Sequence, residues 1–116
     1  MEHVCIADRV LLYVRYGFDN MPYHYDFRFD DEQRAEARLF AEGFARFIRG
    51  DPMILNGQNP RRVAGAIIWL SALYKGSWIT QKQVAQALHI TMSSIRIHAH
   101  RLRATASEFY TNELHI

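Results

Sequence analysis

The segment RRVAGAIIWLSALYKG, residues 61–76, constrains the fold most strongly, because it is apolar on almost every face between Val63 and Leu73. A helix that is apolar all round is usually buried, with neighbours on several sides. Three small residues, Ala-Gly-Ala, follow Val63 and would let other backbones approach closely. Asn59 followed by Pro60 offers an N-cap and a proline in the first turn, which sets the start of the helix. We therefore expect a central helix with the rest of the chain wrapped around it.

Two helices are expected before the central one. Helical spacing predicts the first from Glu2 to Tyr16 and the second from Glu32 to Arg49, with Asp30 or Asp31 as the cap of the second. The segment GFDNMPYHYDFRFDDE, residues 17–32, would separate them and fold its aromatic side chains onto the core. The inward stripes would consist of Val4, Ala7, Leu11 and Leu12 in the first helix and of Ala35, Leu39, Phe40, Phe44 and Phe47 in the second.

Length and pattern set the fold class and the location. No segment alternates between apolar and polar residues for long, so no sheet is expected. The chain has 116 residues, and we expect a single all-α domain of five helices over residues 1–116. No apolar run is long enough to span a bilayer and the N-terminus lacks a signal-peptide pattern, so no membrane partner is expected. With Cys5 as the lone cysteine, an intracellular location is favoured: cytoplasm or nucleoid, or the nucleus of a eukaryote.

The stretch ITQKQVAQALHITMSSIRIHAHRLRA, residues 79–104, has the pattern of a helix-turn-helix, which we place over residues 80–104. Thr80 and Gln83 have the spacing of a capping box, and Thr91 can cap the helix after the turn. The turn falls at His89, where glycine is usual, although histidine tolerates a positive φ better than most residues. The apolar contacts between the helices would come from Val84, Ala85, Leu88, Ile90 and Ile95, with Ala99 replacing a third anchor at His98.

The second helix of this motif separates an apolar face from a basic one. At 3.6 residues per turn, its buried stripe would be Met92, Ile95, Ala99, Leu102, Ala106 and Phe109. The opposite face has the composition of a recognition helix, with short hydroxyls near its N-terminus, an arginine for guanine edges and further cations for phosphate. Arg96 would read guanine, Ile97 would touch a thymine methyl, and Lys82 on the preceding helix would contact backbone phosphate. The predicted DNA-binding residues are Lys82, Thr91, Ser93, Ser94, Arg96, Ile97, His100, Arg101 and Arg103.

The distribution of charge favours the same function but leaves an alternative open. The net charge is +2, yet residues 1–59 hold seven Arg against ten Asp or Glu, a balance of −3. Residues 60–116 hold seven Arg or Lys against two Glu, a balance of +5. A basic half of this kind indicates a polyanionic partner. The alternative is a solvated, basic helical hairpin whose charge is incidental, and pattern does not separate the two.

The segment NPRRVAGAIIWLSALYKGSWITQKQVAQALHITMSSIRIHAHRL, residues 59–102, resembles the second cyclin-like repeat of transcription factor IIB and of its archaeal counterpart. That family has a proline before an alanine-rich central helix, then Gly, Thr-Gln, Val-Ala, a hydrophobic-Thr turn and Ile-Arg. The front half of the chain agrees in helix layout but contributes little motif content. The resemblance implies a cyclin-like domain that ends in a helix-turn-helix. It rests on Pro60, Val63 to Tyr74, Gly76, Thr80-Gln81, Val84-Ala85, Ile90-Thr91 and Ile95-Arg96.

The resemblance also implies partners, namely double-stranded promoter DNA beside a TATA box and TATA-binding protein or other transcription machinery. The family's base-reading arginine falls on Arg96, but its apolar partner three positions earlier falls on Ser93, which puts the sequence preference in question. The family's zinc ribbon and first cyclin repeat are missing, so the chain is either a fragment or a free-standing single repeat. The initial methionine and the complete last helix favour the second expectation. A single repeat would compensate for lost contacts as a homodimer, or act as an accessory or competing regulator.

Catalytic and metal sites are not expected. His98 and His100 are two residues apart on a helix and diverge, His24 lacks ligand spacing, and Cys5 lacks a His-Asp context. The sequence has no phosphate-cradling glycine loop and no catalytic pair, so neither an enzyme activity nor a cofactor is expected. The rival to DNA binding is a cyclin-fold protein-interaction module, which would hold a protein partner through the acidic, aromatic front half.

Overall fold

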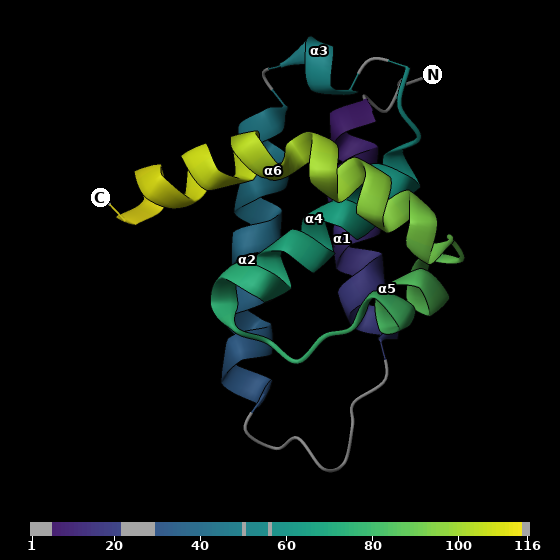
Figure 1. Ribbon diagram of the computed structural model, residues 1–116, viewed down its shortest axis with the longest axis vertical. Helices are drawn as coiled ribbons and strands as arrows, with labels where there is room; N and C mark the ends of the chain where they lie inside the picture. Colours follow the sequence, from purple (N-terminus) through teal and green to yellow (C-terminus); the bar gives the residue numbers. More distant parts are fainter. Residues whose placement is uncertain (1–5, 22–29, 50, 56, 115–116) are drawn as a thin grey trace.

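The computed structural model of the protein describes residues 6–21, 30–49, 51–55 and 57–114. These residues form helices and connecting turns without a strand, so the predicted all-α class is confirmed. Five helices correspond to the five predicted ones, and α3 is an additional helix of four residues. The helices are α1 (Ile6–Asn20), α2 (Asp30–Ile48), α3 (Pro52–Leu55), α4 (Pro60–Lys75), α5 (Gln81–Leu88) and α6 (Met92–Leu114) (Figure 1).

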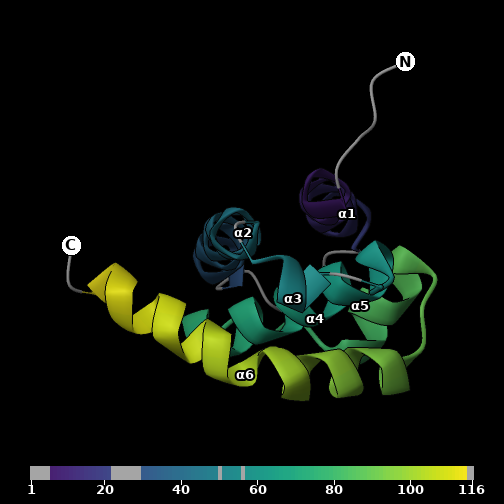
Figure 2. The same cartoon turned by 90° about the horizontal axis from the view of Figure 1, so that it is seen from above.

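Helix α4 is central, as its apolar circumference predicts. The Asn59 side chain accepts hydrogen bonds from the backbone N–H groups of Arg61 and Arg62, at 3.0 and 3.3 Å, and so caps the N-terminus. Gly76 ends the helix in the left-handed conformation with φ 68°, which glycine adopts without strain. Figure 2 shows α1 and α2 side by side on one side of α4, while α6 crosses on the other. The buried residues of α4 are Val63, Ala64, Gly65, Ala66, Ile67, Ile68, Leu70, Ser71 and Ala72.

The prediction for α1 was wrong at Gly17, which does not break the helix. Helix α1 continues through Gly17 to Asn20, and a Cβ at Gly17 would lie 2.6 Å from Ile68 Cδ1 of α4. The glycine therefore allows close helix packing rather than a turn. The inward stripe also differs from the predicted one, because Leu12 is 55% exposed whereas Val10, Val14 and Phe18 are buried. Leu11 is partly buried, and the predicted start at residues 2–5, with Val4, and the aromatics of residues 22–29 lie outside the described residues.

Helix α2 begins at Asp30, so Asp30 and Asp31 lie in its first turn rather than before it. Phe40 and Phe44 face the core as predicted. Ala35 and Leu39 do not, and Leu39 is 72% exposed. Phe47 is 40% exposed because it lies at the margin of the core. The face that packs inward alternates alanines with large side chains and consists of Arg34, Ala37, Phe40, Ala41, Phe44, Ala45 and Ile48.

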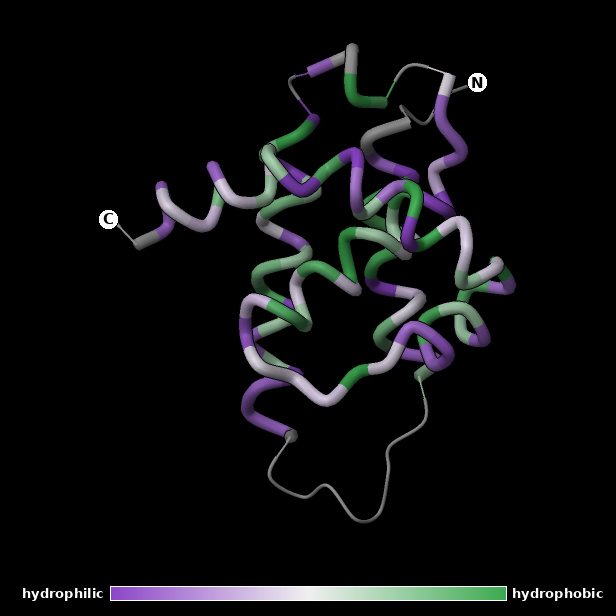
Figure 3. The backbone as a smooth tube through the Cα atoms, in the orientation of Figure 1, coloured by the Kyte–Doolittle hydropathy of each residue, from purple (hydrophilic) through white to green (hydrophobic). Residues whose placement is uncertain are grey.

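The C-terminal half of α6 is anchored by an aromatic cluster. The Phe109 ring lies 5.0 Å from the Phe40 ring and 5.6 Å from the Phe44 ring, centroid to centroid. The Tyr110 ring stacks on Tyr74 at 4.7 Å. Figure 3 shows hydrophobic residues concentrated where the helices meet around α4. Because α2 and α4 hold its distal half, α6 presents its N-terminal half in a fixed orientation.

Candidate nucleic-acid interface

The first helix of the predicted helix-turn-helix, α5, begins at a complete capping box. Gln83 N donates to Thr80 Oγ1 at 3.1 Å, and Thr80 N donates to Gln83 Oε1 at 2.8 Å. The side chain of each residue thereby accepts a hydrogen bond from the backbone N–H of the other, and neither N–H has a partner within the helix. Val84 and Leu88 are buried, as predicted from their spacing. Lys82 is exposed in the first turn of α5.

The turn between α5 and α6 is formed by a histidine in the left-handed conformation. His89 has φ 55° and ψ 48°, and its N–H donates to Ala85 O. The prediction that His89 takes the place of a turn glycine is therefore confirmed. Ser94 N then donates to Thr91 Oγ1 at 3.1 Å, so Thr91 caps α6 as predicted. The hydroxyls of Thr91 and Ser94 also share a hydrogen bond of 2.7 Å.

Helix α6 packs on α4 through most of its predicted stripe. Ile95, Ala99, Leu102 and Ala106 are buried and Phe109 is partly buried. Met92 is 43% exposed and was wrongly assigned to the stripe, because it starts α6 at the edge of the molecule. Ala99 supplies the third apolar contact in place of His98, which is only partly buried. A Cβ on Gly65 would lie 2.5 Å from Ile90 Cδ1, so the motif sits directly on the small residues of α4.

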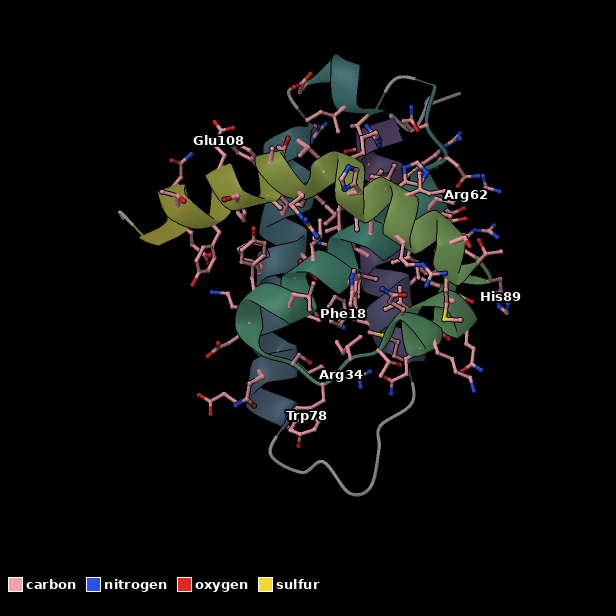
Figure 4. The ribbon with its side chains drawn as sticks, in the orientation of Figure 1. Phe18, Arg34, Arg62, Trp78, His89 and Glu108 are labelled. Atoms are coloured by element: carbon pink, nitrogen blue, oxygen red, sulfur yellow. The ribbon has the colours of Figure 1, made fainter. Side chains whose placement is uncertain are left out.

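The predicted reading residues share one exposed face of α6. Ile97 is 66% exposed, so its side chain is free to contact a partner. Ser94 is half-buried, because Thr91 and the start of α6 enclose it. Side chains project outward along the N-terminal half of α6, between the labelled His89 and Arg62 (Figure 4). The predicted residues exposed in the structure are Lys82, Thr91, Ser93, Arg96, Ile97, His100, Arg101 and Arg103.

Among the described residues, the cations of this face have no acidic partners, in contrast to several cations of the front half. Arg15, Arg38 and Arg46 all lie within 4 Å of the Glu42 carboxylate, and Arg49 lies 3.4 Å from Asp8. In the described part of the chain, no carboxylate lies at ion-pair distance from the cations of α5 or α6. This holds for Lys82, Arg96, Arg101 and Arg103. The positive potential of the face is therefore available to an anion from outside.

Arg101 lies on the flank of the face and is partly committed to the protein. Its Nη1 donates to Ile54 O of α3 at 2.8 Å, and its Nη2 lies 3.4 Å from His98 Nδ1. Burial lowers the pKa of His98, and the charges of Arg101 and Arg62 lower it further. Arg62, in the first turn of α4, is exposed beside this flank and was missed from sequence. The Asn59-Pro60 cap places Arg62 in the exposed first turn of α4, and this sequence signal could have identified Arg62.

A groove runs along the other flank of the face. It has a volume of about 610 Å³ and lies between the C-terminal half of α4, the start of α5 and α6. Its apolar residues are Trp69, Leu70, Leu73, Tyr74 and Ala99, and its polar residues are Gln81, Arg96, His100 and Arg103. The groove joins residues distant in sequence, so no local sequence pattern indicates it.

Comparison with known proteins adds no identification, since no family model, no curated protein and no solved structure matches the chain. Among the described residues, no three His, Cys, Asp or Glu side chains gather where they could hold a metal ion. Cys5 and His24 lie outside those residues. None of the described helices is both long and apolar enough to cross a membrane.

Proposed function

We propose that the chain is a DNA-binding transcription factor in which α5 and α6 act as a helix-turn-helix. The observation that carries the proposal is the row of exposed arginines on α6, which the Thr80 and Thr91 caps and the α4 contacts hold in one orientation and which has no carboxylate at ion-pair distance among the described residues. Phosphates supply most of the binding energy for a surface of this kind. The proposed activity is binding rather than catalysis.

Each residue of the face has a proposed role. Arg96 forks onto the two acceptors of guanine in the major groove, and Ile97 contacts a thymine methyl. Lys82 and Arg103 contact phosphates on either side of the recognition helix, with Arg62 as a further contact on the α4 flank. Ser93 and His100 offer shorter polar contacts to base edges. This division follows the docking of known helix-turn-helix proteins, whose recognition helix reads bases with its N-terminal half.

The resemblance to the second cyclin-like repeat of transcription factor IIB supports a more specific proposal. Its motif residues coincide with caps and turns that the fold uses: Pro60 in the first turn of α4, Gly76 at its end, and Thr80 and Thr91 as caps. We therefore propose a single cyclin-like repeat, acting inside the cell, with TATA-binding protein or other transcription machinery as a protein partner.

The proposal is tested by fluorescence anisotropy with a set of labelled duplexes of different sequence at two salt concentrations. Arg96→Ala should weaken binding by about 1–3 kcal/mol and reduce sequence preference. The matched control is Arg46→Ala, which removes the same charge from α2, where Arg46 contacts Glu42 rather than a free face. If Arg96→Ala and Arg46→Ala bind DNA equally well, the recognition helix is not α6.

A protein-interaction module remains the second candidate, and the groove beside α6 favours it. Leu73, in the groove wall, is 58% exposed, and an exposed leucine next to a cavity suits a protein ligand. Salt separates the two functions, since an apolar protein interface responds weakly to ionic strength whereas phosphate contacts respond steeply. Binding only to TATA-binding protein on a TATA duplex would identify an assembly factor.

A further inference from the structure

The groove between α4 and α6 combines an apolar wall with a row of basic side chains. Leu73 and Trp69 of α4 form the apolar side, and Arg96, His100 and Arg103 of α6 form the basic side. A ligand that fits both sides carries an apolar anchor next to carboxylates. We propose that this ligand is the N-terminal half of α2 from a second copy of the chain.

The N-terminal half of α2 has the required chemistry. Glu32, Glu36 and Leu39 are exposed, and their spacing of four and three residues puts them on one face of the helix. Leu39 is the most exposed large apolar side chain among the described residues, at 72%. In the same part of the chain, no cation lies at ion-pair distance from Glu32 or Glu36. This row is therefore an acidic edge with an unpartnered leucine.

The acidic row and the basic row also match in length. Arg96, His100 and Arg103 have the same spacing of four and three residues as Glu32, Glu36 and Leu39. Seven residues of helix rise about 10.5 Å, so the two rows run over equal distances. Two helices lying along each other can then pair Glu32 with the arginine at one end of the basic row and place Glu36 beside His100, while Leu39 enters the groove beside Leu73.

The acidic row cannot reach the groove of its own molecule. Helix α2 packs on one side of α4 and the N-terminal half of α6 crosses the other (Figure 2). The exposed row of α2 points away from α4 altogether. The contact must therefore form between molecules, with the acidic row of one copy on the basic groove of the next. Such a heterologous interface builds rings or open chains rather than a two-fold dimer.

Self-association of this kind would occupy the cations that we propose for DNA. Arg96 and Arg103 cannot contact a phosphate and a partner's carboxylate at the same time, so DNA and a second copy would compete. This consequence rests on the proposed DNA-binding function, whereas the self-association itself does not.

Sedimentation velocity of the purified chain at low and high salt tests the inference. We expect concentration-dependent association at low salt, at protein concentrations of roughly 0.1–1 mM, and monomers at high salt. Glu36→Arg and Leu39→Ser should each abolish association, while circular dichroism shows an unchanged fold because both side chains are exposed. Glu108→Arg is the control, since Glu108 is exposed on α6 outside the groove.

Mixing two variants that cannot self-associate on their own identifies the interface. Glu36→Arg retains its groove and Arg103→Glu retains its acidic row, so each should be monomeric alone and an equimolar mixture should form a 1:1 complex. A wild-type chain that stays monomeric at low salt, variants that associate like wild type, or a mixture that stays monomeric would each overturn the proposal. If the wild-type chain stays monomeric at low salt but still binds DNA, the proposed DNA-binding function stands without this inference.

Discussion

The distance between Gly65 and Ile90 predicts how Gly65→Ala changes the stability of the protein. A Cβ on Gly65 would lie 2.5 Å from Ile90 Cδ1, 3.5 Å from Ile95 Cγ1 and 3.6 Å from Leu88 Cδ1. Carbon atoms in contact normally stand about 3.5–4.0 Å apart, so only the Ile90 contact is impossible as it is. Gly65→Ala should therefore cost toward the lower end of about 1–3 kcal/mol for overpacking, because Cδ1 is the far end of a flexible, half-buried side chain that can shift, less the roughly 0.5–1 kcal/mol that alanine gains in a helix.

Removing the one clashing atom should reverse the sign of the effect. Ile90→Val deletes Cδ1 and opens the space, so Gly65→Ala in that background should stabilise the protein by roughly 0.5–1 kcal/mol. The coupling between the two substitutions would then be about 1–3 kcal/mol, within the range seen for residues in contact. Urea unfolding followed by far-ultraviolet circular dichroism measures all four proteins of the cycle.

The control for this cycle uses the same chemistry at an exposed site. Ile97→Val also removes one methyl, but Ile97 is exposed on the outer face of α6 and lies away from Gly65. It should show no coupling to Gly65→Ala. Zero coupling between Gly65→Ala and Ile90→Val would refute the close packing of the helix-turn-helix on α4.

Three further predictions concern the cap, the core and the titration of α6. Thr91→Ala should destabilise the protein by about 0.5–2 kcal/mol because α6 loses its cap, whereas Thr111→Ala, at an exposed position, should have little effect in the same urea assay. Leu102→Ala should cost about 2–5 kcal/mol, since Leu102 is 1% exposed, and a thermal melt with an unchanged midpoint would contradict this. Because the pKa of His98 is lowered in the folded protein, folding disfavours its protonation, so its contribution to stability is present above its unfolded pKa and is lost as pH falls through its folded pKa. The free energy of unfolding should therefore depend less on pH in His98→Gln than in wild type below about pH 6.5, the ordinary histidine pKa. An unchanged slope there would show that His98 does not contribute to the pH dependence of stability.

Features that depend on local chemistry were predictable from the sequence. The Asn59-Pro60 start of α4, the Thr80–Gln83 capping box and the Thr91 cap each involve residues within three positions of one another. A left-handed residue at His89 also follows from the short spacing between α5 and α6. Such signals need no knowledge of the tertiary fold, which is why they were correct to the residue.

Features that depend on distant packing were not predictable in the same way. Gly17 has the appearance of a helix breaker, yet its lack of a Cβ serves the approach of Ile68, 51 positions further along the chain. Leu39 fits an apolar stripe by spacing but is exposed, because α2 turns the face of Ala37 and Ala41 toward the core and Leu39 lies on the opposite side of the helix. The groove beside α6 has walls from three helices and leaves no local pattern. The candidate reading residues were found because one helix carries almost all of them.

The central claim is most directly tested by the salt dependence of DNA binding. If Lys82, Arg103 and Arg62 each contact a phosphate, the logarithm of the association constant should fall against the logarithm of salt concentration with a slope of about −3. Lys82→Ala should reduce that slope by about 1 and weaken all duplexes alike, while Arg96→Ala should abolish differences between duplexes. A slope near zero, or a Lys82→Ala slope equal to that of wild type, would contradict DNA binding through α5 and α6.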